Sequence, residues 1–186
     1  FGTACGWSDR LRLDLVLNDF VVDAMHSNKI EILSDGSPWR PLIDVRDMAR
    51  AIAWAAFRER ESGGQFLVVN VGSNEGNYQI LDIASLVAQL IPGTEISINR
   101  DAQPDTRSYQ VDFSLFEDLA PNFKPRVSLA ESVETLQAGL SGMYFLNKRF
   151  RSSPYMRLNT LRGLIERGAI DESLRWKGMK SDKEGL

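Results

Sequence analysis

The chain has 186 residues but only one cysteine, Cys5, and one histidine, His26. A disulfide needs two cysteines, and zinc sites draw several ligands from His and Cys. The composition therefore excludes a disulfide framework and a His/Cys metal site within one chain. It predicts a cytoplasmic, metal-free protein.

Long apolar runs and a strong net charge are also missing. No apolar run reaches the roughly 20 residues that a membrane-spanning helix requires. The 22 Lys plus Arg residues nearly balance the 25 Asp plus Glu residues, which leaves a net charge of -3. Such a chain has no global field to attract nucleic acid or an anionic membrane surface. We expect neither partner.

The start of the chain lacks an initiator methionine and the basic and apolar regions of a signal peptide. The residues Phe1-Gly2-Thr3 are instead typical of the middle of a strand. This pattern indicates a fragment or a processed piece of a longer polypeptide.

Apolar spacing predicts an alternation of helices and strands along the chain. Helices are expected at 13–27, 46–59, 80–90, 114–119, 128–145 and 155–168, and strands at 30–33, 42–45, 65–71, 96–98 and 109–112. The strand at 65–71 is expected to be buried because it is rich in valine. Crossovers of this length favour an α/β fold, a parallel sheet covered on both faces.

The segment 35–47, DGSPWRPLIDVRD, combines three signals around Arg40. Residues 35–38 have turn chemistry and predict a hairpin or a tight loop. Asp44, followed three residues later by Asp47, resembles a capping box at the start of a helix. Arg40 is thus expected where a loop enters a sheet edge, and its guanidinium suits a phosphate or carboxylate. The alternative is a surface ion pair with Asp35 or Asp44.

Four ordered blocks carry a resemblance to a known family: GTACGWSDRLRLDLVLNDFV, IEILSDGSPWRPLIDVRDMARAI, FLVVNVGSNEGNYQILDIASLV and PDTRSYQVDFS. Together they resemble the C-terminal half of an extended short-chain dehydrogenase/reductase, of the NAD-dependent epimerase/dehydratase family that acts on nucleotide sugars. The resemblance implies the C-terminal part of a Rossmann-like doubly wound sheet within 1–98, interleaved with segments of a small α+β substrate-binding lobe. That lobe and the C-terminal helices are expected within 99–176, and a disordered tail within 177–186.

The resemblance also implies a set of substrate-binding residues. Thr3 matches a position that touches the substrate, and Leu33 matches backbone against the nucleotide base. Asn18 matches an asparagine that holds the nucleotide diphosphate, and Arg40 and Arg107 match two arginines that grip it. Two guanidinium groups suit a diphosphate, because each can bind it in a bidentate manner.

Other interpretations of these residues stay open. Asn18 also fits an ordinary polar residue on a helix face, and Arg107 fits a pair with Asp105 or Asp112.

The resemblance also implies cofactor contacts, because in the same family the strand-end loop at 1–6 lies beside the nicotinamide and the sugar. Phe1 and Ala4 are therefore expected to contact the cofactor.

The chain departs from the family in its catalytic motifs. Relatives use a Tyr-x-x-x-Lys pair with a nearby Ser or Thr, and a glycine-rich turn for the cofactor pyrophosphate. No G-x-G-x-x-G turn occurs in the 186 residues. One Tyr-x-x-x-Lys is present, at Tyr144 and Lys148, but it lies far downstream of the family position and is interpreted as helix packing. We therefore assign no catalytic residue. Cys5 and His26 are expected to be a buried thiol and a capping or surface residue.

These observations predict the substrate-side half of a nucleotide-sugar epimerase or dehydratase, inactive as it stands. The complete enzyme would use NAD or NADP, act on a nucleotide-diphosphate sugar and form a homodimer. The fragment alone is expected to bind no cofactor tightly. The alternative is a non-catalytic binding or scaffold module that pairs with another chain, since an incomplete sheet leaves an unpaired edge and an uncovered apolar face.

Overall fold

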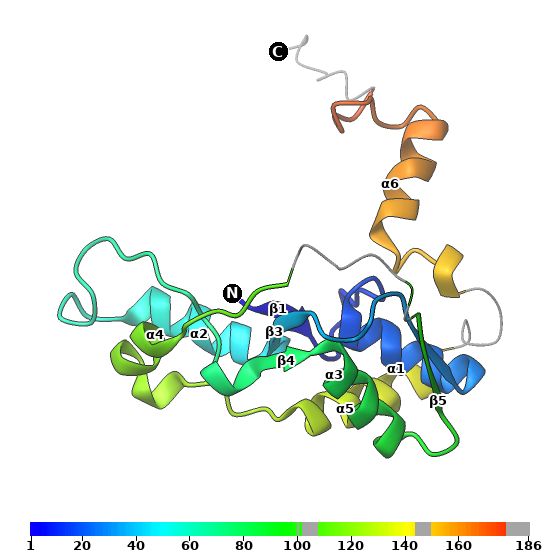
Figure 1. The fold of residues 1–186 in the computed structure, drawn as a ribbon. Helices are drawn as coiled ribbons and strands as arrows, with labels where there is room; N and C mark the ends of the chain where they lie inside the picture. Colours follow the sequence, from blue (N-terminus) through cyan, green and yellow to red (C-terminus); the bar gives the residue numbers. More distant parts are fainter. Residues whose placement is uncertain (100, 102–107, 144–149, 178–186) are drawn as a thin grey trace, which may run out of the picture.

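The computed structural model of the chain describes residues 1–99, 101, 108–143 and 150–177 (Figure 1). Its elements in chain order are β1 (Thr3–Cys5), α1 (Val16–Ser27), β2 (Lys29–Ile32), β3 (Trp39–Asp44), α2 (Val45–Phe57), η1 (Asn74–Gly76), β4 (Asn77–Gln79), α3 (Ile80–Leu90), β5 (Glu95–Ile98), α4 (Ser114–Leu119), η2 (Pro121–Phe123), α5 (Leu129–Ser141), η4 (Phe150–Ser152) and α6 (Arg157–Glu166).

The strands form two small sheets. β1 pairs in parallel with β3, with Thr3 opposite Leu42, and β4 pairs antiparallel with the other side of β3. β2 pairs in parallel with β5, with Lys29 opposite Glu95. Helices lie between these strands in the chain, so the predicted α/β class with parallel pairing is confirmed.

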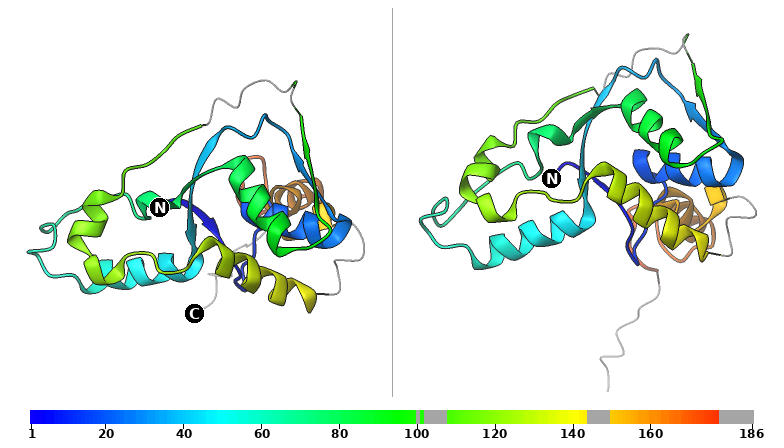
Figure 2. Two further views of the ribbon diagram at one scale, coloured as in Figure 1. Left: turned by 60° about the horizontal axis from the view of Figure 1, so that its bottom comes forward. Right: turned by 90° about the horizontal axis from the view of Figure 1, so that it is seen from below.

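Three helices enclose the main apolar core. α1, α3 and α5 lie together at one end of the molecule, and α2 and α4 lie at the other end (Figure 2). The three helices bury residues at the helical spacing that predicted them, namely Leu17, Val21, Ala24, Ile80, Ile83, Val87, Val133, Leu136 and Leu140. A second cluster joins α2, α4 and Val71, in which Trp54 packs edge-on against Phe116 with ring centres 5.4 Å apart.

Helix starts follow the capping signals in part. Ser128 and Glu131 form the predicted capping box of α5, since each side chain accepts from the backbone N–H of the other. Asp44 caps α2 and accepts a hydrogen bond from the Arg46 N–H. The prediction that Asp47 completes a box there is wrong. Its carboxylate accepts from a distant loop instead, because Asp47 is buried against residues 126–127.

The expected buried strand at 65–71 is also wrong. The chain bends at 65–66, and the Gly2 N–H donates to the Val71 carbonyl, but no strand forms. Alternate side chains of an extended segment point to opposite sides. Val71 is buried in the second cluster, whereas Phe66 and Val68 are 84% and 78% exposed. Only one side of this segment is therefore covered within the described residues.

The surroundings of Arg40 follow the prediction in part. The turn at 35–38 forms, with Asp35 Oδ1 accepting from the Ser37 N–H, but the flanking strands β2 and β3 do not pair as a hairpin. Arg40 lies inside β3, opposite Tyr78, and β3 is the middle strand of its sheet. Among the described residues, β1 pairs with β3 only at 42–44, so Arg40 is paired on one side, to β4, directly after the loop, as predicted for a loop that enters a sheet edge.

Smaller differences concern element ends. α1 begins at Val16, α5 ends at Ser141, and 109–112 forms no strand. α6 extends away from the body of the molecule and buries no residue (Figure 1).

Candidate functional site

A cavity of about 760 Å³ is lined by parts of α1, β2 and β3. Its walls also include Thr3 of β1, Ile80 of α3 and Tyr109. This volume falls within the range of about 300–1,000 Å³ typical of small-molecule sites. The cavity joins segments from 3 to 109, so it is a product of the tertiary fold.

Arg40 provides the positive charge of this cavity among the described residues. Its Nη1 donates to the Trp39 carbonyl at 2.7 Å, and its guanidinium carbon lies 5.9 Å from the centre of the Tyr109 ring. β4 pairs with β3 at Arg40, and β1 pairs with β3 two residues further on, from Leu42, so the backbone that carries Arg40 belongs to the sheet through β4. The guanidinium is thus held on the cavity wall, where it can bind an anion.

Three carboxylates occupy other parts of the same cavity wall. Asp14 precedes α1, Asp19 lies in its first turn, and Glu31 projects from β2. Asp14 accepts two hydrogen bonds from Arg12, at 3.0 and 2.6 Å, and these bonds hold the pKa of Asp14 below its usual range. Carboxylates accept hydrogen bonds from hydroxyl and amine groups. The cavity therefore offers both a cation and several acceptors to one ligand.

Asp19 is the most perturbed of these groups. Burial raises the pKa of its carboxyl to about 6, although Arg151 opposes the rise with its Nη1 at 3.0 Å from Oδ1. Arg151 also pairs with Asp23, one turn further along α1. About a quarter of the Asp19 side chain stays exposed. Asp19 thus connects the cavity wall to the segment that precedes α6.

Two of the predicted substrate residues, Thr3 and Leu33, line this cavity together with Arg40. Thr3 is half-buried in β1, and Leu33 is 76% exposed just after β2. The fold thus brings together three of the five residues that the resemblance assigned to the substrate. Their contacts with a ligand stay a prediction.

Asn18 has a different environment. It is buried, its Oδ1 accepts from the Gly6 N–H at 3.1 Å, and its Nδ2 donates to the Arg12 carbonyl at 2.8 Å. Both ends of the amide therefore hold the loop between β1 and α1. Asn18 does not line the cavity, and its role toward the diphosphate stays a prediction.

The remaining predicted positions do not line the large cavity or lie outside the described residues. Arg107 lies outside the described residues, as do Tyr144 and Lys148. Ala4 pairs with Ile43 in the sheet, and Phe1 is 57% exposed. The assignment of Phe1 and Ala4 to the cofactor stays a prediction.

A second cavity, of about 290 Å³, lies near Cys5, Asp44 and Ser132. Ser132 Oγ donates to Asp44 Oδ2 at 2.7 Å, and burial together with the Asp44 carboxylate raises the pKa of Cys5 to about 12. A nucleophilic cysteine needs a lowered pKa. No histidine is among the described residues that line this cavity. Cys5 is buried, which confirms the expectation of a buried thiol, and its raised pKa disfavours the thiolate.

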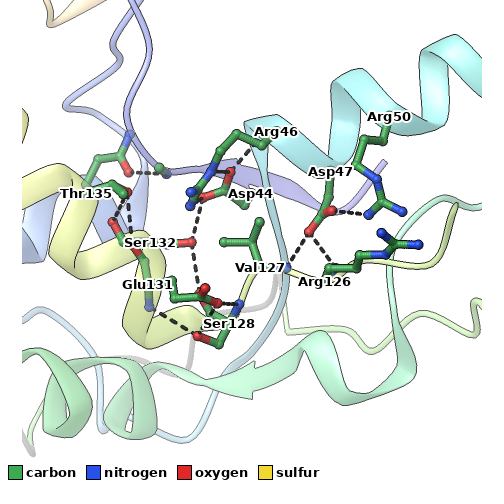
Figure 3. A network of polar contacts seen from close by, with 12 residues as sticks. Asp44, Arg46, Asp47, Arg50, Arg126, Val127, Ser128, Glu131, Ser132 and Thr135 are labelled. Atoms are coloured by element: carbon green, nitrogen blue, oxygen red, sulfur yellow. Dashed lines mark hydrogen bonds and ion pairs between the residues drawn. The ribbon is translucent and has the colours of Figure 1, made fainter.

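A hydrogen-bond network occupies the polar groups of this second cavity (Figure 3). Arg46 donates from Nε and Nη2 to the two oxygens of Asp44. Burial alone would raise the pKa of Asp44, but the bonds from Arg46 and Ser132 outweigh it and hold the pKa low. Nearby, Asp47 Oδ2 accepts from the backbone N–H groups of Arg126 and Val127. These groups fasten α2 to the start of α5.

Other candidate sites are not supported by the described part of the chain. Within it, no three His, Cys, Asp or Glu side chains are grouped to hold a metal ion. None of its helices has the length and apolar character to cross a membrane. His26 lies exposed in the last turn of α1, with its ring edge-on to Phe150. This position confirms a capping or surface residue.

Sequence reasoning missed Tyr109, Asp19 and Glu31 as cavity residues. Asp19 and Glu31 follow the ordinary polar pattern of a helix face and a strand, so no local signal marks them. Tyr109 stands two positions after Arg107, inside the PDTRSYQVDFS block that carried the resemblance. That proximity was the one available signal.

Comparison with known proteins identifies the family to which the cavity region is similar. The model of the NAD dependent epimerase/dehydratase family matches residues 11–72, which confirms the predicted resemblance. The matched stretch contains Asp14, Asp19, Glu31, Leu33 and Arg40 of the cavity wall.

Solved structures agree with this result at the level of the fold. MoeE5 in complex with UDP-glucuronic acid and NAD is 23% identical, with a TM-score of 0.61 over 77% of this chain and 46% of its own. TunA, an NAD-dependent NDP-hexosamine 5,6-dehydratase involved in tunicamycin biosynthesis, is 18% identical, with a TM-score of 0.61 over 77% and 45%. UDP-glucuronic acid 4-epimerase from Bacillus cereus, in complex with UDP-glucuronic acid and NAD, is 23% identical, with a TM-score of 0.61 over 77% and 44%. This chain thus spans a little under half the length of each.

Proposed function

From the resemblance of residues 11–72 to the NAD-dependent epimerase/dehydratase family, we propose that the chain is the substrate-side part of a nucleotide-sugar epimerase or dehydratase. The ligand of the 760 Å³ cavity is a nucleoside diphosphate linked to a sugar. Arg40 binds the diphosphate, together with Arg107, while Thr3 contacts the sugar and Leu33 the base.

The observation that carries this proposal is the charge distribution of one cavity. Arg40 and the carboxylates of Asp14, Asp19 and Glu31 share its wall. A diphosphate matches a guanidinium, and the hydroxyl groups of ribose and sugar match carboxylate acceptors. A nucleotide sugar contains both kinds of group in one molecule. MoeE5 and the Bacillus cereus epimerase, which share the fold, were solved with such a ligand.

The described residues do not fit the pyrophosphate of NAD. Such a group binds at a helix N-terminus behind a glycine-rich turn. Here the starts of α2 and α5 are capped by the side chains of Asp44 and Ser128, and no G-x-G-x-x-G turn precedes any helix of the described residues. We therefore place the glycine-rich turn for the cofactor pyrophosphate, the catalytic tyrosine and its lysine in residues outside this chain. NAD or NADP supplies transient or net hydride transfer at a sugar carbon there, and the fragment is inactive.

The same proposal divides the chain by role. Residues 1–98 contain the end of the Rossmann-like sheet interleaved with substrate-lobe segments, and 99–176 contain the rest of that lobe and the C-terminal helices. The complete enzyme is a homodimer.

Calorimetric titration of the 186-residue chain with UDP, dTDP, GDP and CDP tests the diphosphate site. We expect at least one to bind, and Arg40→Gln to weaken that binding about tenfold or more, because hydrogen bonds to a charged group contribute about 1.5–3 kcal/mol. Arg162→Gln is the matched control, since it removes the same charge from α6, outside the cavity. Absence of binding, or equal effects of the two substitutions, would contradict the proposal.

A second candidate is the non-catalytic scaffold module, which is consistent with the apolar side chains that the fold leaves exposed. Phe57, Phe66 and Val68 are strongly exposed and offer an apolar surface for pairing with another chain. Both candidates need such a surface, so the titration separates them. A scaffold module predicts association with another protein and no nucleotide binding.

A further inference from the structure

The segment that carries Tyr109 is fastened to β3 and β4. Ser108 Oγ accepts from the Trp39 N–H at 3.0 Å, and the Tyr109 N–H donates to the Trp39 carbonyl at 3.4 Å. Two positions on, the Val111 N–H donates to Asn77 Oδ1 at 2.9 Å, while Asn77 Nδ2 donates to the Val111 carbonyl at 3.0 Å. Tyr109 is therefore held from both sides, although no strand forms.

The ring of Tyr109 does not serve the apolar core. It belongs to neither core cluster, and the residue is 50% exposed where it lines the 760 Å³ cavity. A large aromatic side chain normally buries most of its surface when packing is its role. On the cavity wall the ring lies beside Arg40, whose guanidinium carbon is 5.9 Å from the ring centre.

The two residues also share one backbone acceptor. The Trp39 carbonyl accepts from Arg40 Nη1 and, at longer distance, from the Tyr109 N–H. The contacts of Arg40 with this carbonyl and with the ring restrict its side chain on two sides. A side chain that is already restricted loses less conformational entropy when a ligand binds, so the ligand binds more tightly.

We propose that Tyr109 is a positioning residue that orients the Arg40 guanidinium for the diphosphate of the ligand. This inference rests on the proposed function, because it assumes that a nucleoside diphosphate reaches Arg40. The ring acts through its face, by cation–π attraction, so the phenol hydroxyl is dispensable. Arg40 makes the contact with the ligand, and Tyr109 sets its direction.

A double-mutant cycle tests the inference, with the tightest binder among UDP, dTDP, GDP and CDP as the probe. Removal of the ring in Tyr109→Leu should weaken binding about threefold to fivefold, the size of a partly exposed cation–π contact. Tyr109→Phe should bind like the unmodified chain. In the Arg40→Gln background, Tyr109→Leu should change nothing further, because the group that the ring orients is gone.

Two controls separate positioning from folding. Tyr109→Gln repeats the loss of the ring with a polar side chain, and urea unfolding shows whether either variant is less stable. Trp176→Leu removes a 67% exposed aromatic ring outside the cavity and should leave binding unchanged.

The outcomes are distinguishable. Equal effects of Tyr109→Leu in both backgrounds, or no effect while Arg40→Gln weakens binding, would overturn the positioning role and leave the proposed function intact. No binding of any of the four nucleotides to the unmodified chain would overturn the proposed function and this inference with it.

Discussion

In the 290 Å³ cavity the Asp44 side chain is inaccessible and accepts hydrogen bonds from Arg46 and Ser132, whereas the carboxylates of the 760 Å³ cavity stay partly accessible. Asp14 and Asp19 each keep about a quarter of their side chain exposed and pair with arginines that face solvent. Carboxylates paired with arginines are thus buried in the small cavity and accessible in the large one.

The difference shows why a cluster of polar groups is not by itself a functional site. Groups that already satisfy one another in a buried network stabilise the fold and have little capacity left for a ligand. Groups at an accessible wall retain that capacity. Substitutions in the small cavity should therefore change stability, and substitutions in the large cavity should change binding.

Asp47→Ala should give the largest loss of stability. The carboxylate is buried and accepts from Arg50 and from the backbone N–H groups of Arg126 and Val127, so its removal takes the acceptor from these two partly buried N–H groups. We expect a loss of about 3 kcal/mol in the free energy of unfolding, measured in urea. Asp82→Ala, in the exposed first turn of α3, should cost about 0.5 kcal/mol. Similar losses for both would show that the network does not stabilise the fold.

Gly6→Ala should be nearly as damaging. Gly6 has φ +94°, and a Cβ there would collide with the Asp44 carboxylate. We expect a loss of about 2–3 kcal/mol from backbone strain and collision together. Gly93→Ala is the matched control, because Gly93 has a similar φ of +86° and no atom within 4 Å of an added Cβ. Its cost, about 1 kcal/mol, measures the strain alone.

Much of the helical scaffold could be predicted locally. α3 and α4 have the predicted bounds, and the Ser128 capping box forms as expected, since these signals lie within a few residues of one another. The segment 65–71 shows the limit of this reasoning. Its valines favour a strand, but a strand needs a neighbour, and the pairing seen is one bond from Gly2 to Val71.

The large cavity was predictable only through the resemblance. Thr3, Leu33 and Arg40 were named from family positions and do share its wall. Asp19 and Tyr109 were missed because their place depends on contacts across many residues, such as Asp19 with Arg151 and Tyr109 with Trp39. Asn18 looks like a polar helix residue in sequence, yet it is buried because its amide satisfies the loop between β1 and α1.

Because Asp19 has a raised pKa, the stability of the protein should depend on pH. Its folded pKa of about 6 lies above the ordinary value of 3.8, so the folded state holds the proton more tightly than the unfolded chain. This contribution to stability is fully present below about pH 4 and is lost as the pH rises through 6. The Asp19→Asn protein has no carboxyl at this position, so it does not lose this stability as the pH rises. Its stability relative to the unmodified chain should rise by about 2–3 kcal/mol between pH 4 and pH 8.

Urea unfolding of both proteins across this pH range measures the effect. Burial also raises the pKa of Asp23, and Asp23 shares Arg151 with Asp19, so Asp23→Asn measured over the same pH range gives the part of the change that belongs to Asp23. A difference that does not change with pH would show that the Asp19 pKa is ordinary in the folded state.

Glu31→Gln should have the smallest effect on stability, within about 0.5 kcal/mol, because Glu31 is exposed on β2. It removes a carboxylate from the wall of the large cavity without changing its shape. If hydroxyl groups of the ligand donate to this wall, the dissociation constant of the best nucleotide should rise about twofold to fivefold, since an amide oxygen is a weaker acceptor than a carboxylate. If the wall only repels the diphosphate, binding should instead become tighter, because one negative charge is gone. Titration of Glu31→Gln therefore shows whether the carboxylates of the large cavity bind the ligand or only limit where its phosphates lie.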